Sequence, residues 1–128
     1  MLAFALLACS SAGTNERENG GTIVSESGAL SVTWQCVSGD APARGRNRFE
    51  LTIESTESGE PRDGLTLSMV PFMPAMGHGS STVPMITAIG SGKYEAEDVV
   101  LAMPGVWELR TTISAGEPDY AVPRVEID

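Results

Sequence analysis

Residues 48–54, RFELTIE, indicate the fold class because apolar and polar side chains alternate along them. Phe49, Leu51 and Ile53 share one parity, and polar residues fill the positions between them. Alternation with a period of two residues is typical of a β-strand that has one buried face. The stretch therefore predicts a strand whose apolar side lies on a hydrophobic core.

Short runs of the same kind recur along the chain, and no segment shows a sustained helical period. They are residues 30–37, 64–70, 85–89, 93–103, 106–114 and 120–127. Residues 57–64 are dense in turn formers, so we expect residues 48–54 and 64–70 to pair as a hairpin or across a long loop. Pro123 lies inside the last run and predicts an edge strand or a bulge, because proline donates no hydrogen bond to a ladder.

These runs predict an all-β fold, an antiparallel immunoglobulin-like β-sandwich of about seven to eight short strands. A small open barrel is the alternative, since periodicity alone does not separate the two folds. Trp34 and Trp107 are expected to fill the centre of the core. Cys36 has the parity of a core residue, and we favour a buried thiol there over a metal ligand.

The composition indicates one acidic domain. With 128 residues, 41% of them hydrophobic, the chain has enough apolar surface for one core. A formal charge of −9 disfavours nucleic acid as a partner. A single histidine leaves few groups for acid–base chemistry, so we expect no enzyme and no catalytic residues. The acidic run Glu95, Glu97 and Asp98 is expected to be a solvated strand face.

The N-terminal segment predicts export. Residues 1–8, MLAFALLA, are apolar but too short to span a bilayer, and they are interpreted as a signal peptide remnant. Residues 6–9, LLAC, resemble the lipobox of bacterial lipoproteins, in which the cysteine is lipidated. We therefore expect Cys9 to be lipidated and residues 9–21 to form a flexible tether. A folded domain is expected over residues 22–128. The location would be extracytoplasmic and membrane-anchored, on the periplasmic side in a Gram-negative source.

Residues 69–79, MVPFMPAMGHG, hold the motif that carries chemistry. Met-Pro-Ala-Met at residues 73–76 fits a β-turn with proline second, which would bring the thioethers of Met73 and Met76 together. His78 follows between two glycines, whose backbone freedom would let the imidazole turn to the same point. Two thioethers and an imidazole suit Cu(I), and the imidazole also suits Cu(II).

Other methionines divide between core and site. Met69 has the parity of a core residue, whereas Met85 opens a strand and is equally balanced between the two roles. Met73 and Met76 are assigned to metal binding, because a loop rich in proline and glycine is expected to keep its side chains out of a core built from strands. Met103 ends a strand at another turn and is a fourth candidate ligand if the fold brings that turn beside Met73.

At these positions the sequence resembles the YtkA-like and FixH-like family of small extracytoplasmic domains. The resemblance rests on residues 73–79 (MPAMGHG), 92–96 (GKYEA) and 103–109 (MPGVWEL), and it extends to residues 47–53 and 64–71. It implies an immunoglobulin-like domain that handles copper, either for the assembly of haem–copper oxidases or beside metal-efflux components. It points to Met73, Met76 and His78 as ligands.

Two functions follow as hypotheses. The first is a lipid-anchored copper-binding module, a chaperone or buffer for Cu(I), whose partner is a copper-accepting or copper-exporting membrane protein. Its ligands would be Met73, Met76 and His78, with Met103 and Met85 as additional candidates. The second is a non-catalytic immunoglobulin-like adaptor lipoprotein whose Met-rich loop contacts a protein partner, because methionine also serves adaptable binding surfaces.

Overall fold

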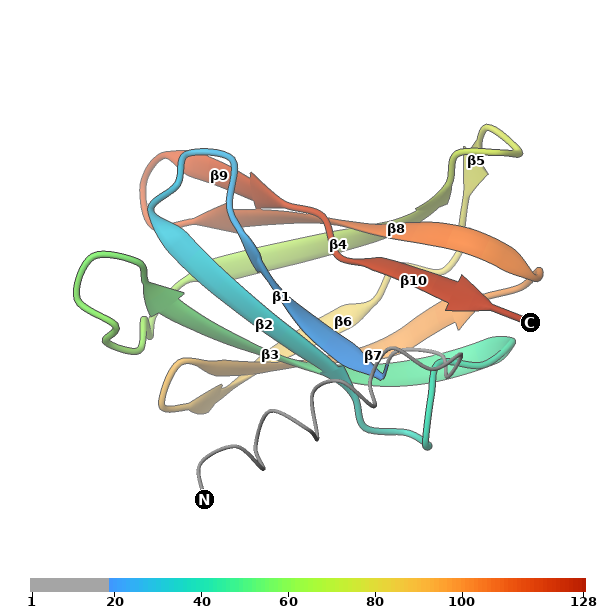
Figure 1. The fold of residues 1–128 in the computed structure, drawn as a ribbon, viewed down its shortest axis with the longest axis horizontal. Helices are drawn as coiled ribbons and strands as arrows, with labels where there is room; N and C mark the ends of the chain where they lie inside the picture. The colour runs from blue at the N-terminus through green and yellow to red at the C-terminus, as the bar shows by residue number, and fades with distance from the viewer. Residues whose placement is uncertain (1–18) are drawn as a thin grey trace, which may run out of the picture.

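A computed structural model describes residues 19–128, which form two antiparallel β-sheets stacked as a sandwich, without a helix (Figure 1). The first sheet consists, in spatial order, of β1 (Gly20–Val24), β2 (Leu30–Cys36), β3 (Gly45–Ser55), β7 (Lys93–Leu101) and β6 (Met85–Gly90). The second consists of β10 (Arg124–Ile127), β8 (Gly105–Ser114), β4 (Thr66–Met73) and β5 (His78–Gly79), with β9 (Pro118–Ala121) also paired to β8. The predicted all-β sandwich is confirmed.

The alternating pattern of β3 produces the centre of the core. Phe49, Leu51 and Ile53 are fully buried, as their shared parity predicts. Trp34 of β2 and Trp107 of β8 are buried too, and the Trp34 and Phe49 rings lie 6.1 Å apart between centroids. Both sheets therefore contribute one tryptophan to the same core, as expected.

The predicted pairing of residues 48–54 with residues 64–70 is wrong. β3 lies between β2 and β7 in the first sheet, whereas β4 lies between β8 and β5 in the second. The chain bends back onto β3 only briefly, where the Arg62 amide donates to the Ile53 carbonyl at 2.9 Å. It then crosses to the other sheet, which lets the apolar faces of both strands meet across one core.

Pro123 divides the last run into two strands. β9 and β10 both pair with β8, on the same edge of the second sheet, and the Pro123 carbonyl between them accepts a hydrogen bond from the Leu109 amide at 2.8 Å. The predicted edge strand with an interruption is confirmed. The strand count exceeds the expected range because of this split, the two-residue β5 and β1, which no predicted run covers.

Two further predictions concern Cys36 and the ends of the domain. Cys36 is buried with 2% exposure, as expected for a core thiol. β1 begins at Gly20, inside the range assigned to the tether. The signal remnant at residues 1–8 and Cys9 lie outside the described residues. Within residues 19–128, no helix has the length and apolar character needed to cross a membrane.

Candidate metal centre

The Met-rich motif forms a tight hairpin between β4 and β5. Met73 ends β4, and its carbonyl accepts hydrogen bonds from the amides of Met76 at 3.1 Å and Gly77 at 3.0 Å. The first of these bonds closes a β-turn with Pro74 in its second position, the geometry predicted from the sequence. Gly77 has a φ of 70°, a conformation that glycine adopts without steric penalty.

The hairpin pairs Met73 directly with His78. Residues directly opposite each other on antiparallel strands project from the same face of the sheet, with Cβ atoms about 5 Å apart. Met73 faces the core with 3% exposure, and His78 is exposed. An imidazole and a thioether therefore share one face at the rim of the sandwich, the first open to solvent and the second beneath it.

The expectation that Met73 stays out of the core is wrong. Met69, Pro71 and Met73 are all buried, so the alternation of β4 continues through Pro71 to the end of the strand. The cause is the register with β8, which carries the inward-facing side of β4 up to the turn. Burial leaves the thioether of Met73 a candidate donor, because the unbranched side chain has several rotatable bonds.

The turn between β7 and β8 packs against the hairpin, which meets the condition set for Met103. A Cβ atom at Gly105 would lie 2.5 Å from the terminal methyl carbon of Met73. The indole nitrogen of buried Trp107 donates to the Met103 carbonyl at 2.9 Å and holds the same turn. The hairpin and this turn lie at one end of the sandwich (Figure 1). Met103 itself is partly buried against the core.

The remaining two methionine candidates have different surroundings. Met76, in the turn, is 52% exposed. Met85 is 61% exposed and opens β6 in the other sheet, where it pairs with Glu97. The structure thus places Met73, Met76 and His78 in one hairpin, Met103 in the neighbouring turn, and Met85 on a separate strand.

The base of the hairpin is held by contacts that sequence reasoning missed. The guanidinium of Arg110 stacks over the ring of Phe72 at 3.9 Å and also bonds the Glu108 carboxylate at 2.8 Å. Phe72 precedes Met73 on the opposite face of β4, so this cation–π contact fixes the strand from outside. Phe72 and Arg110 are far apart in sequence, so their contact becomes visible only once Phe72 is seen to pair with Glu108 on β8.

The acidic run on β7 stays out of the candidate centre. Glu95 and Asp98 form ion pairs with β3, to Arg48 at 3.2 Å and to Arg46 at 2.6 Å respectively. In the described part of the chain, no three His, Cys, Asp or Glu side chains are grouped closely enough to hold a metal ion. The donors of the hairpin are of another kind, soft thioethers with one imidazole, and this set fits Cu(I).

A protein-family model described as YtkA-like matches residues 26–112. Neither a curated protein nor a solved structure matches the chain. The matched residues run from the turn before β2 into the second half of β8 and include the whole β4–β5 hairpin and the β7–β8 turn.

Proposed function

The chain belongs to the YtkA-like family, and on this premise we propose that it is an extracytoplasmic, lipid-anchored module that binds Cu(I) at the β4–β5 hairpin. It acts as a chaperone or buffer and catalyses no reaction. Cys9 carries the lipid, and the copper is cargo passed to or from a membrane protein that accepts or exports it. Oxidase assembly and metal efflux are the two processes that such a module would serve.

The observation that supports this proposal best is the pairing of Met73 with His78. A soft thioether on the core side and an imidazole on the solvent side lie on one face of the same hairpin. Met76 lies in the turn that joins them, and its exposed thioether is free to close over a metal ion. Three donors from one short hairpin require little ordering of the chain on binding, which favours affinity.

The donor set also suits an oxidising compartment. Thioethers bind copper without losing a proton, and they do not form disulfides. A thiol, by contrast, must lose its proton to bind copper and can be consumed by disulfide formation. Cys36, the one cysteine in residues 19–128, is buried in the core. The hairpin therefore offers copper ligands that remain usable outside the cytoplasm.

A competition titration with a chromogenic Cu(I) chelator, under anaerobic conditions, tests the proposal. The chain contains 2 cysteines, so the titration uses a Cys9→Ser, Cys36→Ala background that leaves methionine as the only source of sulfur. We expect the protein to withdraw one equivalent of Cu(I) from the chelator. Met76→Ala and His78→Ala should each weaken binding about tenfold or more, since loss of even an outer partner of a metal ligand has such an effect.

Met85→Ala is the matched control, because Met85 is as exposed as Met76 but lies on β6. Both Met76 and His78 are exposed, so their substitution leaves the core intact. Failure to compete with the chelator, or equal losses in the Met76 and Met85 variants, would refute copper binding at the hairpin.

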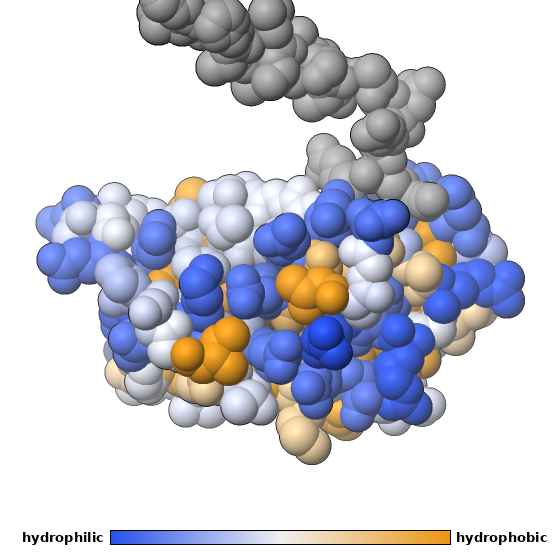
Figure 2. Space-filling view, turned by 90° about the horizontal axis from the view of Figure 1, so that it is seen from below, coloured by the Kyte–Doolittle hydropathy of each residue, from blue (hydrophilic) through white to orange (hydrophobic). Residues whose placement is uncertain are grey.

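The exposed methionines also favour the second function, an adaptor that contacts a protein partner through the Met-rich loop. Met76 and Val83 are exposed apolar residues on either side of β5, and flexible methionines suit variable partners. On the face shown in Figure 2, hydrophobic residues form small groups separated by hydrophilic ones. An adaptor would use the exposed Met76 and Val83 beside β5, and partner binding without Cu(I) competition would favour this function over the first.

A further inference from the structure

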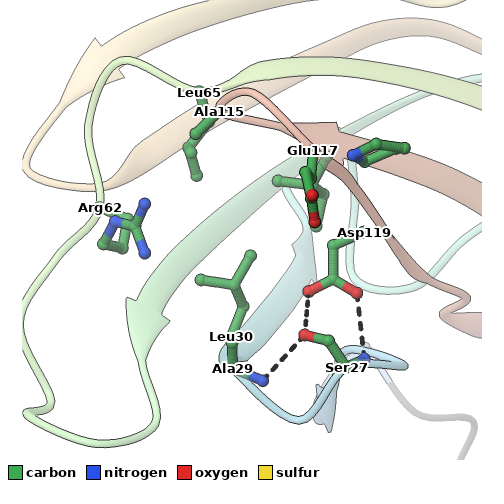
Figure 3. A pocket seen from close by; sticks show the side chains of 10 residues that line it. Ser27, Ala29, Leu30, Arg62, Leu65, Ala115, Glu117 and Asp119 are labelled. Atoms are coloured by element: carbon green, nitrogen blue, oxygen red, sulfur yellow. Dashed lines mark hydrogen bonds between the residues drawn. The ribbon is translucent and has the colours of Figure 1, made fainter.

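A small cavity opens at the end of the sandwich opposite the hairpin (Figure 3). β8 begins beside the hairpin at Gly105 and ends at Ser114, and the cavity lies where the chain continues from β8 towards β9. Its volume is about 220 Å³. Pockets for drug-sized ligands measure about 300–1,000 Å³, so this cavity fits a smaller molecule.

Three aliphatic side chains from both sheets form the apolar part of the cavity. Leu30 opens β2, Ile113 lies near the end of β8, and Leu65 directly precedes β4. Leu30 and Ile113 are buried, with 5% and 1% exposure, and Leu65 is partly buried. A short hydrocarbon chain lying here would be removed from water.

Arg62 provides a positive charge on one side. Its backbone is fixed, because its amide donates to the Ile53 carbonyl at 2.9 Å and its carbonyl accepts a hydrogen bond from the buried Tyr94 hydroxyl at 2.7 Å. Within residues 19–128, no carboxylate lies within ion-pair distance of its guanidinium. Arg62 lies in the loop between β3 and β4, whereas the basic residues on the strands do pair with carboxylates: Arg46, Arg48, Lys93, Arg110 and Arg124.

This absence of a partner is unusual for a residue in its position. The whole chain has a charge of −9, and Arg62 is partly buried. Arg44, the other arginine without a carboxylate partner among residues 19–128, is exposed to water. A partly desolvated guanidinium with unfilled donors is suited to a carboxylate, which it binds through two parallel hydrogen bonds.

Two carboxylates line the opposite side. Asp119 is held in place by Ser27, whose amide and hydroxyl donate to its two oxygens at 3.1 Å and 2.6 Å. Glu117 is exposed, and its side chain makes no hydrogen bond to residues 19–128. Figure 3 shows Arg62 on one side of the cavity, Glu117 and Asp119 on the other, and Leu30 between them.

We infer that this cavity binds a small zwitterion whose carboxylate and ammonium groups stand at the two ends of a short aliphatic chain. Arg62 binds the carboxylate, the methylene groups lie on Leu30 and its aliphatic neighbours, and Glu117 and Asp119 receive the ammonium group. The order of positive, apolar and negative surface across the cavity matches such an ω-amino carboxylate. The inference does not depend on copper binding, because the two sites lie at opposite ends of the sandwich.

The test is a titration of the full chain, labelled with nitrogen-15, with 5-aminopentanoate, followed by amide chemical shifts. L-Norvaline is an isomer of 5-aminopentanoate in which the ammonium and carboxylate groups are bonded to the same carbon. Pentanoate and pentylamine carry one charged group each. We expect saturable shifts around Leu30, Leu65 and Ile113 with 5-aminopentanoate, and binding about tenfold weaker or more for each comparison compound, as for the loss of a charged hydrogen bond.

Variants of matched charge identify the two ends of the site. Arg62→Gln and Glu117→Gln should each weaken binding of 5-aminopentanoate about tenfold, whereas Arg44→Gln and Glu57→Gln, in exposed positions, should leave it unchanged. Three results would overturn the inference: no saturable shift, equal binding of L-norvaline, or full binding by Arg62→Gln. Loss of copper binding in the hairpin variants would have no bearing on any of them.

Discussion

The terminal methyl carbon of Met73 lies 2.5 Å from the position that a Cβ atom would take at Gly105. Because real side chains do not approach so closely, the missing side chain of Gly105 provides the space that the buried Met73 occupies. The last residue of β4 is thereby packed on the first residue of β8. This contact places the Met-rich hairpin beside the turn that carries Met103.

Replacement of Gly105 by alanine tests this contact. We expect Gly105→Ala to displace the flexible end of the Met73 side chain and to lower the free energy of unfolding, measured with urea, by about 1 kcal/mol beyond the backbone effect, at the low end of overpacking costs. Gly116→Ala provides the backbone effect, because its φ of 123° is close to the 130° of Gly105 and its surroundings within 4 Å are empty. Equal losses in the two variants would show that Met73 is not constrained by Gly105.

Trp107→Phe should loosen the β7–β8 turn. It removes the 2.9 Å hydrogen bond from the indole to the Met103 carbonyl, which contributes about 1 kcal/mol on top of the lost packing. Hydrogen exchange at the amides of Met103 and Gly105, which flank Pro104, should therefore accelerate. Trp34→Phe, a change of the same size on the other sheet, should leave the turn amides unaffected. Similar exchange in both variants would contradict a holding role for Trp107.

A pair of buried methionines separates the core role of Met73 from its proposed copper role. Met73→Leu and Met69→Leu both conserve volume and should each lower stability by less than about 1.5 kcal/mol. Met69 and Met73 are both buried with the same strand parity, but only Met73 lies at the hairpin. The chelator titration should show weaker Cu(I) binding for Met73→Leu alone. Weakening by both variants would indicate a general effect of the core.

Asp119 should make stability depend on pH in the acidic range. Burial of its carboxylate raises its pKa, but hydrogen bonds from the side chains of Ser27 and Ser25 and from two backbone amides outweigh burial, so the net pKa is lowered. A lowered pKa in the folded state contributes stability above the unfolded-state pKa, about 3.9 for aspartate. That contribution is lost as pH falls through the folded-state pKa.

Asp119→Asn removes the titrating group and checks this dependence. We expect the variant to be less stable at pH 7 by about 1 kcal/mol and to show a smaller drop in the free energy of unfolding below about pH 4. Asp40→Asn, in an exposed loop, is the control for the change of charge. An acid-dependent drop that is identical in the wild type and Asp119→Asn would assign the drop to other carboxylates.

Most strands were predictable because alternation is a local property, whereas the short β1 and β5 were not among the predicted runs. The alternation of Phe49, Leu51 and Ile53 predicts β3, and the turn formers at residues 90–92 and 104–105 mark where β7 and β8 begin. Which strands pair is a different matter, since two amphipathic strands joined by a turn-rich loop bury their apolar faces equally well within one sheet or across two. The partners of β3 and β4 therefore required the structure.

The sequence predicted the β-turn of the candidate site correctly, but it did not predict the burial of Met73. The proline at position 74 indicates the β-turn, and the hydrogen bond from Met76 to Met73 bears it out. The same proline-rich context suggested that Met73 leaves the core, yet the ladder between β4 and β8 continues up to Phe72 and carries Met73 inward. The burial of Met73 is determined by the register of β4 with β8, a strand distant in sequence. The residues of the loop alone do not indicate that register.

The central claim is that thioethers of the hairpin, with His78, bind Cu(I). X-ray absorption at the copper edge, on the chain with Cys9→Ser and Cys36→Ala, tests it most directly, because methionine is then the only source of sulfur scattering. We predict two or more sulfur neighbours together with a nitrogen neighbour of imidazole type, loss of one sulfur in Met76→Ala, and loss of the imidazole signal in His78→Ala. A spectrum with only oxygen and nitrogen neighbours, or one that neither variant changes, would contradict the claim.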